Sequence, residues 1–520
     1  MKRFRALLIL LTAAALTVQA AVKPADIFSD GLVLQRGEPV NIWGTADSSE
    51  EITVEFAGQK KTTEAGADGK WLITLDPLQG SEHPRELIFY SFGNRQSAIK
   101  NVLVGEVWLA GGQSNMATTM QTYKRKTQPD IDRAQDDLLR FCTIPQNHFP
   151  GHNKGQRPEW LKTNPETVKG FSGTAYYFAK ELRKHLDVPV GIIVCATGGT
   201  PAEAWMSRKT LDSKPELKRT IDAYDRHVTR EFPTDADYEE ALKEYNRAKK
   251  EYTRLREAGK KVKKPREVMG PRNFKRPCGL HENMLTQTIP FTVKGVIWYQ
   301  GENNASQKAG LHYRTVFSTL IEEWRSEFGK PELPFFFCQL ATLGWGDDSH
   351  WPELRDAQQW VADHVPNTGI AILLDGGEKT DIHPHSKDIA GYRLGLLARN
   401  KIYGEKGLCA EGPRFKKVDF QGRKAVISFA DTNLVLRPGG ENTFELAGKD
   451  GVFKPASAEL KNGKIILTAE DLPVPAYVRY GWRKWVTPTL YNREGLPAGP
   501  FRSDDLPMAS AGGYFLDWVE

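Results

Sequence analysis

The chain has 520 residues, which is enough for two to four domains with sizeable hydrophobic cores. Its formal net charge is only +6, and the basic residues are not gathered into one dense patch, so composition argues against nucleic-acid binding. The five cysteines are scattered without CxxC spacing, which argues against a zinc site, and their odd number leaves at least one thiol free.

The first twenty residues have the pattern of a secretory signal peptide. Lys2, Arg3 and Arg5 precede the apolar run Ala6–Val18, and small residues follow before Ala21. An uncleaved membrane anchor is the alternative, but the run is short for spanning a bilayer. We therefore expect residues 1–20 to be removed and the mature chain to be exported, to a periplasm or beyond, with no membrane span.

Residues 21–100 have the pattern of a small β-sandwich. Short β-like runs such as Val40–Trp43, Ile52–Phe56 and Trp71–Leu75 are bounded by turn-forming residues, and helical periodicity is absent. We favour a structural role for this module over carbohydrate binding.

From residue 101 to residue 408, strand-like runs alternate with amphipathic segments, which predicts an α/β domain with a parallel sheet covered by helices. The predicted strands are 107–110, 188–195, 290–298, 333–340 and 370–374, and the predicted helices are 172–185, 313–328, 353–365 and 388–399. Residues 409–520 return to β-like runs with Gly and Pro turns, which predicts a C-terminal β module.

Residues 208–277 interrupt the α/β pattern. They are dense in charged residues, and Tyr238–Lys260 carries charges of alternating sign at helical spacing. This pattern predicts a solvent-exposed helical insertion, arranged as a hairpin. A nucleic-acid-binding arm is the alternative, and the abundant Glu and Asp residues argue against it.

The stretch from Gly105 to Met116 combines a buried strand, two glycines and a serine at the start of a helix. Alone, Ser114 is as well explained as a helix cap. In a parallel sheet, however, loops that follow strands gather at one edge, where such folds place their ligands. This context favours Ser114 as a nucleophile, and it predicts that Gly111 and Gly112 let the backbone pass close to the substrate ester.

Other polar loops follow the neighbouring predicted strands. His383 is the candidate general base for Ser114, with Asp381 or Glu378 as the carboxylate that orients its imidazole, while His385 is a competing base. No G-x-S-x-G motif surrounds the serine, which argues against the usual α/β-hydrolase nucleophile elbow.

The same loops offer donors for an oxyanion hole. The backbone amides of Ser114 and Gly199, together with a side-chain amide from Gln300 or Asn303, are the candidates. Glu302, between these two amides in the sequence, is a candidate substrate-binding residue.

Three motifs resemble those of the sialate O-acetylesterases, which belong to the SGNH (GDSL-like) hydrolase superfamily. They are GEVWLAGGQSNM at 105–116, WYQGENNA at 298–305 and DIHP at 381–384, with supporting matches at 202–205 and 354–358. The resemblance implies a three-layer α/β/α catalytic domain and acetyl-ester hydrolysis without metal or cofactor.

Carried over residue by residue, the resemblance makes Ser114 the nucleophile and His383 the base. It makes Gly199, with Gly198 as its rival, an oxyanion-hole residue, and it assigns a further donor to Gln300 or Asn303. The acid departs from the wider superfamily, because Thr380 stands three residues before the histidine and Asp381 stands two before it. Some relatives manage with a Ser–His dyad and a backbone carbonyl.

The expected substrate is an O-acetylated sialic acid, whose carboxylate calls for a basic contact. An acetyl-xylan or other polysaccharide deacetylase on the same scaffold is the alternative, and a noncatalytic carbohydrate-binding protein is a third possibility. Trp205, Trp345 and Trp351 are candidates for stacking on sugar rings, or they are ordinary core residues. We expect no nucleic-acid partner, and the sequence leaves the oligomeric state open.

Overall fold

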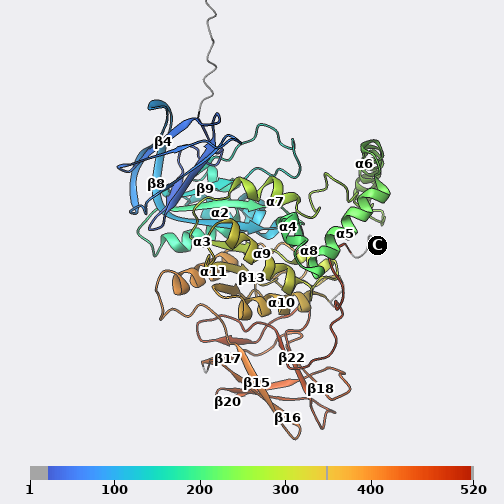
Figure 1. Cartoon of the computed structure of the whole chain (residues 1–520). Helices are drawn as coiled ribbons and strands as arrows, with labels where there is room; N and C mark the ends of the chain where they lie inside the picture. The colour runs from blue at the N-terminus through green and yellow to red at the C-terminus, as the bar shows by residue number, and fades with distance from the viewer. Residues whose placement is uncertain (1–21, 347–349, 432, 517–520) are drawn as a thin grey trace, which may run out of the picture.

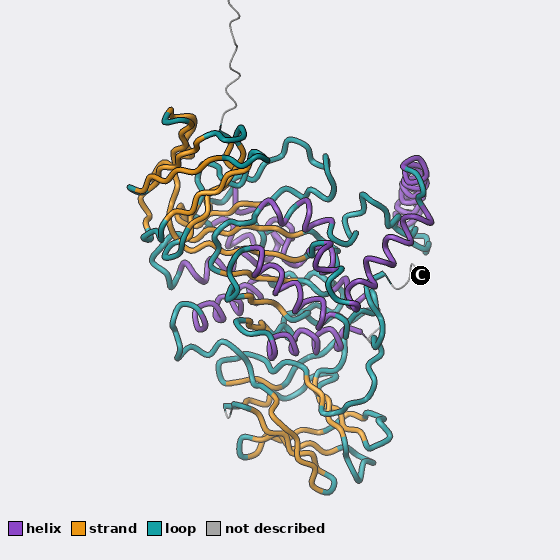
Figure 2. Tube along the Cα trace, viewed as in Figure 1, coloured by secondary structure: helices purple, strands orange, loops and turns teal. Residues whose placement is uncertain are grey.

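The computed structural model describes residues 22–346, 350–431 and 433–516. The predicted signal segment, residues 1–20, lies outside them. The fold is mixed α/β: a central sheet flanked by helices lies between a β module near the N-terminus and another near the C-terminus (Figures 1 and 2).

The central sheet has the strand order β10-β9-β11-β8-β12-β13-β14. All neighbours in this order pair in parallel except β10, which is antiparallel to β9. The strands are β8 (Asn94–Gly112), β9 (Asp136–Thr143), β10 (Trp160–Thr163), β11 (Val190–Ala196), β12 (Gly295–Tyr299), β13 (Phe335–Cys338) and β14 (Thr368–Ala371). Every predicted strand of this domain overlaps one of them.

Helices cover both faces of the sheet, because side chains of successive strand residues point to opposite faces. Trp108 of β8 packs against Phe178 of one helix layer, with ring centroids 5.1 Å apart. Trp298 of β12 packs on the opposite face against Trp324, at 5.4 Å. The first layer holds α3 (Gly173–Arg183) and α11 (Lys387–Lys401), and the second holds α9 (Tyr313–Glu327) and α10 (His350–His364). These four helices match the predicted ones within a few residues.

The N-terminal module has two β-sheets that share one core, in which Trp71 packs against Phe89. One sheet contains β1 (Lys23–Pro24), β3 (Val40–Thr45) and β6 (Lys70–Leu75); the other contains β2 (Val33–Gln35), β4 (Glu51–Phe56), β5 (Gln59–Glu64) and β7 (Ser81–Ser91). This second sheet continues into the central sheet, because the first half of β8 pairs with β2 and β7 and its second half pairs with β11 and β12. The boundary expected between residues 100 and 101 therefore falls inside a strand.

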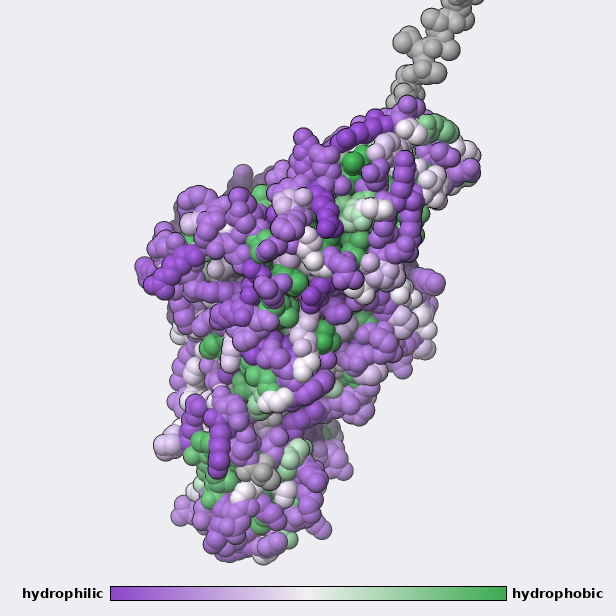
Figure 3. Space-filling model, turned by 90° about the vertical axis from the view of Figure 1, so that its left-hand side faces the viewer, coloured by the Kyte–Doolittle hydropathy of each residue, from purple (hydrophilic) through white to green (hydrophobic). Residues whose placement is uncertain are grey.

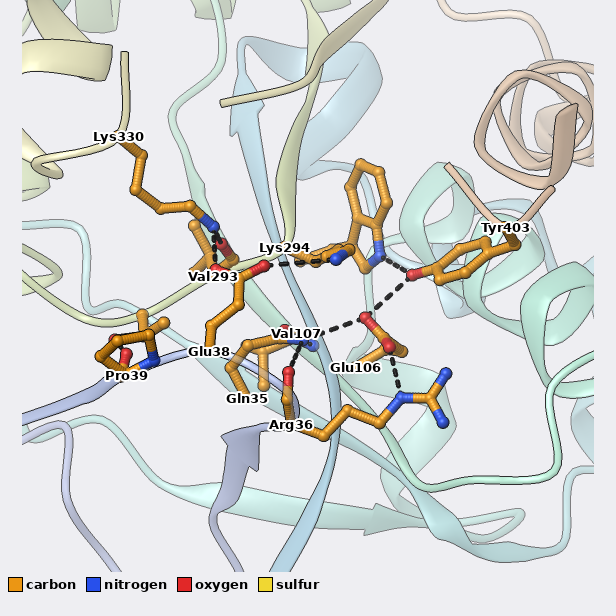
Figure 4. A network of polar contacts seen from close by, with 12 residues as sticks. Gln35, Arg36, Glu38, Pro39, Glu106, Val107, Val293, Lys294, Lys330 and Tyr403 are labelled. Atoms are coloured by element: carbon orange, nitrogen blue, oxygen red, sulfur yellow. Dashed lines mark hydrogen bonds and ion pairs between the residues drawn. The ribbon is translucent and has the colours of Figure 1, made fainter. Parts of the chain in front are cut away.

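A polar network fixes the N-terminal module to the start of the parallel strands (Figure 4). The buried carboxylate of Glu106 accepts hydrogen bonds from Arg36 at 2.5 Å and from the Tyr403 hydroxyl at 3.1 Å. Nearby, Glu38 forms ion pairs with Lys294 and Lys330. Glu106 lies where the parallel pairing of β8 with β11 begins, whereas Ser114 follows the residue where that pairing ends, so the network supports the fold rather than the candidate site.

The charged segment forms α4 (Arg208–Leu211), α5 (Pro215–Glu231) and α6 (Asp235–Glu257), and α6 lies at the side of the molecule (Figure 1). Helix α6 begins with a capping box between Thr234 and Asp237. In Figure 1 α5 and α6 point in different directions, so they do not lie side by side in the simple hairpin that we expected.

The C-terminal module is built from short strands, as the sequence predicts. They form sheets of order β15-β16-β21-β20, β17-β23 and β19-β18-β22-β24. Their bounds are β15 (Phe415–Gln421), β16 (Lys424–Phe429), β17 (Leu434–Leu436), β18 (Phe444–Ala447), β19 (Lys454–Pro455), β20 (Ser457–Lys461), β21 (Lys464–Thr468), β22 (Tyr477–Tyr480), β23 (Leu490–Asn492) and β24 (Phe501–Arg502).

After β24 the chain leaves this module and returns to the central α/β domain (Figure 1). The backbone amides of Ala509 and Ser510 donate to Glu353, at 2.5 and 2.8 Å. Further on, Phe515 and Leu516 are buried in a small cluster with Met269. The tail therefore packs against the charged insertion.

Hydrophilic residues predominate on the face shown in Figure 3, with hydrophobic residues in small separate areas. Among the described residues, no helix has both the length and the hydrophobicity needed to cross a membrane. All five cysteines lie within the described residues and are free thiols.

Candidate active site

The candidate site lies where β8, β11 and β12 end side by side. Gly112 at the end of β8 is in register with Ala196 of β11 and with Tyr299 of β12. The amide of Gln113 donates to the Tyr299 carbonyl at 2.9 Å, and the amide of Thr197 donates to the Gly112 carbonyl at 3.1 Å. Three of the predicted polar loops therefore begin at one level, at the carboxyl edge of the sheet.

Ser114 and His383 meet at this edge. Ser114 is the first residue of the short helix α1 (Ser114–Ala117), and His383 lies in the loop between β14 and α11. The distance from His383 Nε2 to Ser114 Oγ is 2.9 Å, and both residues are partly exposed. This is a hydrogen bond between a hydroxyl and an imidazole that can accept its proton.

The two glycines before Ser114 have a different cause from the one we expected. Gly112 has φ +133°, and a Cβ there would lie 2.2 Å from the carbonyl oxygen of Tyr299. A Cβ on Gly111 would lie 3.0 Å from the Trp298 ring. The close approach is thus between β8 and the residues of β12, and it is not explained by the substrate ester.

The acidic residues of the loop differ in the histidines they face: Asp381 lies near both, with its Oδ2 3.5 Å from His385 Nε2, whereas Glu378 lies near His385. Asp381 Oδ1 accepts a hydrogen bond from the backbone amide of His383 at 2.8 Å and lies 3.7 Å from His383 Nδ1. Glu378 Oε1 instead accepts from the backbone amide of His385 at 2.7 Å. Asp381 is therefore the carboxylate that faces the candidate base, at ion-pair distance rather than hydrogen-bond distance.

The surroundings of His383 favour its neutral form. Burial lowers the pKa of the imidazole, the nearby ammonium of Lys387 lowers it further, and the carboxylate of Asp381 opposes both. A histidine below its ordinary pKa is unprotonated at neutral pH, as a general base must be.

A buried polar chain lies next to the candidate pair Ser114–His383. The ammonium of Lys387 donates to Asn115 Oδ1 at 2.5 Å, and Asn115 Nδ2 donates to Glu302 Oε1 at 2.5 Å and to the Ile382 carbonyl at 3.1 Å. Asn115 directly follows Ser114, and Ile382 directly precedes His383, so this hydrogen bond connects the two loops of the pair. Sequence reasoning missed this role; the position of Asn115 beside the serine was a possible signal, whereas nothing in the local sequence marked Lys387.

Glu302 belongs to this buried hydrogen-bonded chain with Asn115 and Lys387, and it is not exposed at the candidate site. It is only 3% exposed. Burial raises the pKa of its carboxyl group, while the hydrogen bond from Asn115 lowers it. The expectation that Glu302 contacts substrate does not fit this position.

The two candidate side-chain donors also differ in position. Gln300 is fully buried, and its amide nitrogen lies 3.0 Å from the Thr200 carbonyl and 2.8 Å from Asn304 Oδ1. Asn303 is partly exposed, and its amide donates to the Gly199 carbonyl at 2.8 Å. The structure therefore places Asn303 at the site, whereas Gln300 holds the loops together behind it.

The two glycines of the β11 loop lie next to one another but face different neighbours. A Cβ on Gly198 would lie 3.3 Å from Ser114 Cβ, whereas a Cβ on Gly199 would lie 3.9 Å from Lys275 and Phe274. Gly198 is therefore the glycine that packs directly against Ser114, and Gly199 lies one residue further toward the insertion.

The three tryptophans differ in exposure. Trp205 is fully buried, and its indole donates to Thr200 at 3.1 Å. Trp351 is buried on α10 and donates to the Ala341 carbonyl at 2.9 Å. Only Trp345 of the three is exposed, at 52%, so Trp205 and Trp351 are core residues and not sugar platforms.

One group among the described residues has metal-ligand types close together, outside this site. His281 of α7 (Gly279–Asn283) lies 2.9 Å from Glu327, and Glu323 completes the group. The Ser114–His383 pair shares no residue with it.

The hydrogen bond between Ser114 and His383 brings together the residue types of a nucleophile and its base, and comparison with known proteins indicates the class of protein. A family model described as "Carbohydrate esterase, sialic acid-specific acetylesterase" matches residues 104–252 and 273–401. Because this match covers more than half of the chain, the chain belongs to that family, and the protein is a carbohydrate esterase.

Individual relatives extend the similarity to nearly the whole chain. The sialate O-acetylesterase of Rattus norvegicus is 28% identical over 92% of this chain and 93% of its own length. That of Homo sapiens is 27% identical over 92% of this chain and 91% of its own length. The crystal structure of a carbohydrate acetylesterase from Xanthomonas citri matches 93% of this chain and 100% of its own, with a TM-score of 0.75 and 32% identity.

Proposed function

We propose that the protein is an exported sialate O-acetylesterase of the SGNH type, with Ser114 as nucleophile. The observation that carries this proposal is the 2.9 Å contact between His383 Nε2 and Ser114 Oγ. The family match supports a carbohydrate ester as substrate. The names of the mammalian relatives support sialic acid as its sugar.

In the proposed reaction, His383 removes the hydroxyl proton as Ser114 Oγ attacks the acetyl carbonyl. Asn303 and the backbone amides of Ser114 and Gly199 stabilise the negative oxygen of the tetrahedral intermediate. The intermediate collapses, the C–O bond to the sugar breaks, and His383 gives its proton to the departing sugar oxygen. Water then attacks the acetyl-serine with His383 again as base, and acetate leaves while Ser114 regains its proton.

Asp381 has a secondary part in this scheme. Its carboxylate faces His383 Nδ1 at 3.7 Å, so it stabilises the imidazolium that forms during attack without a direct hydrogen bond. A Ser–His pair with an assisting carboxylate therefore describes the site better than a tightly hydrogen-bonded triad.

A second candidate function is O-deacetylation of a plant polysaccharide such as acetylated xylan. The similarity of this chain to the Xanthomonas citri structure supports this second candidate, because that protein is described as a carbohydrate acetylesterase without reference to sialic acid. A noncatalytic carbohydrate-binding role is less well supported, because the serine and histidine are both present and hydrogen bonded.

Acetate release from O-acetylated sialic acid and from acetylated xylan separates the two substrates. We expect a kcat/KM at least about tenfold higher on the sialic acid, and loss of at least about 10³-fold of turnover in Ser114→Ala. Ser48→Ala changes an exposed serine of the N-terminal module; it is the control and is expected to retain wild-type rates. Near-wild-type turnover by Ser114→Ala would overturn the nucleophile assignment, and preference for xylan would overturn the substrate.

Export is a further part of the proposal, and it rests on the first twenty residues. Expression of the full chain in a Gram-negative host, followed by fractionation and N-terminal sequencing, tests it. We expect the periplasmic or secreted protein to begin at Ala21. Recovery of the uncleaved chain in the cytosol would contradict it.

A further inference from the structure

A cavity adjoins the candidate active site on the side of the charged insertion. Its volume is about 330 Å³, near the lower end for small-molecule sites. Lys264, Arg266 and Lys275 come from the segment that returns from α6, Asn303 comes from the loop after β12, and Phe515 comes from the C-terminal tail. Three distant parts of the chain therefore build its walls.

The cavity and the catalytic serine share neighbours. Asn303 lines the cavity and also donates to the Gly199 carbonyl at 2.8 Å. A Cβ on Gly199 would lie 3.9 Å from Lys275, and a Cβ on Gly198 would lie 3.3 Å from Ser114 Cβ. A sugar whose acetyl group reaches Ser114 can therefore extend over the glycine loop toward the Lys275 ammonium.

The cavity lining is predominantly cationic. Three of its charged side chains are basic and one, Glu267, is acidic. Lys275 donates to Glu267 at 2.6 Å, and an ammonium has three donor hydrogens, so this contact leaves donors for a second anion. Lys275 is also only 21% exposed, and partial shielding from water strengthens a contact between opposite charges.

The C-terminal tail holds this wall in place. Phe515 is 1% exposed and packs with Met269 of the returning segment. The guanidinium of Arg219 lies 4.7 Å from the ring centre of the adjacent Tyr514. The tail therefore buries its aromatic residues against the insertion and gives the cavity one apolar side.

Part of the wall lies outside the stretches that the family model matches. The family model matches residues 104–252 and 273–401, so Lys264, Arg266 and Glu267 fall in the stretch between the two matches. Lys275 and Asn303 lie inside the second match. The charged residues of the cavity thus come both from the matched stretch and from the stretch between the two matches.

We propose that this cavity is an anion subsite for the substrate, which binds the carboxylate of an acidic sugar while its acetyl ester lies at Ser114. The proposal rests on the proposed function and deepens it, because it names the charge that the substrate must carry. Lys275 supplies the inner contact, and Lys264 and Arg266 supply an outer positive field. Sialic acid and a uronic acid share the recognised chemistry.

Direct binding to the full-length chain tests the subsite without requiring turnover. The probes are N-acetylneuraminic acid and its methyl ester, which differ in the negative charge, together with glucuronic acid and its methyl ester. We expect each free acid to bind about 3- to 30-fold more tightly than its methyl ester, as a partly exposed charged hydrogen bond allows. We expect N-acetylneuraminic acid to bind more tightly than glucuronic acid.

Variants assign the preference to the cavity. In Lys275→Gln and in the exposed Lys264→Gln we expect the ratio of acid to methyl-ester affinity to fall, more so for Lys275. Lys263→Gln is the matched control, because it removes an exposed lysine of the same segment that does not line the cavity. Its ratio is expected to equal that of the wild type.

The outcomes separate this proposal from the proposed function. Equal binding of acid and methyl ester by the wild type, or a preference that survives in both cavity variants, would overturn the subsite. Loss of the preference in Lys263→Gln as well would also overturn it, by showing a diffuse effect of charge. A chain that binds the acids as expected but releases no acetate from O-acetylated sialic acid would retain the subsite and overturn the proposed substrate.

Discussion

Asn115 and Glu302 form a 2.5 Å hydrogen bond between the loop that carries Ser114 and the loop that follows β12. The same amide group of Asn115 also donates to the Ile382 carbonyl, and its oxygen accepts from Lys387. One buried side chain thus connects three loops that converge on the site. The Asn115 side chain is hydrogen bonded to neither Ser114 nor His383 among these contacts, yet its removal should affect catalysis because it holds their loops in place.

Asn115→Ala is expected to reduce both stability and turnover. It removes the partner of two buried ionisable groups, which should lower the free energy of unfolding by about 2–4 kcal/mol. The loss of loop alignment should lower kcat by at least about tenfold. Denaturant unfolding and steady-state kinetics measure these effects, with the exposed Asn94→Ala as control. Unchanged values of both quantities would show that Asn115 does not support the site.

The pH profile of kcat/KM should report the lowered pKa of His383. Because burial and Lys387 lower that pKa, the base stays neutral below its ordinary value of about 6.5, and activity should fall only at more acidic pH. Lys387→Gln removes a cation and should move the acid limb to higher pH, whereas Asp381→Asn removes an anion and should move it lower.

The same shift has a consequence for stability. The folded-state pKa of His383 is below its unfolded value, so as pH falls below about 6.5 the unfolded chain binds the proton first and stability decreases.

Shifts of the acid limb of the kcat/KM profile in the same direction in Lys387→Gln and Asp381→Asn would contradict the electrostatic assignment. Lys401→Gln, an exposed residue at the other end of α11, should leave the limb in place.

The two carboxylates of the histidine loop should differ in their effect on rate. Asp381 faces His383 Nδ1 at 3.7 Å, while Glu378 contacts the backbone of His385. We expect Asp381→Asn to lower kcat/KM about 10- to 100-fold, less than in a tightly bonded triad, and Glu378→Gln to lower it less than about threefold. A larger loss in Glu378→Gln would reassign the acid.

Gly112→Ala tests the close approach of β8 and β12. A Cβ there would lie 2.2 Å from the Tyr299 carbonyl oxygen, and its φ of +133° is unfavourable for alanine. We expect the free energy of unfolding to fall by about 2–4 kcal/mol. Gly170→Ala is the control, because no atom lies within 4 Å of a Cβ at that position. Equal stability of the two variants would contradict this explanation.

The order of elements and the main candidate site residues could be predicted from the sequence. Strands such as β11 and helices such as α3 were predictable because their apolar spacing is a local property of the chain. Ser114 and His383 were predictable because each follows a strand of one parallel sheet, and because their motifs resemble those of a known family. The structure brings the two side chains together as expected.

Which polar residues face the site and which are buried behind it could not be predicted from the sequence and became clear from the structure. Gln300, Glu302 and Asn303 are close in sequence, yet Gln300 and Glu302 are buried and Asn303 is partly exposed. Their positions depend on contacts with residues of distant loops, such as Asn115 and Gly199. Local periodicity carries no information about such contacts.

Contacts between distant parts of the chain also explain why the continuous strand β8 and the cationic cavity could not be predicted. The sequence pattern changes near residue 100, but pairing with β2, β7, β11 and β12 makes one strand cross that boundary. Lys275 and Phe515 are far apart in the chain and line the same cavity. The composition of residues 208–277 predicted an exposed charged insertion. Because the C-terminal tail packs against this insertion, part of it lines a cavity beside the candidate active site.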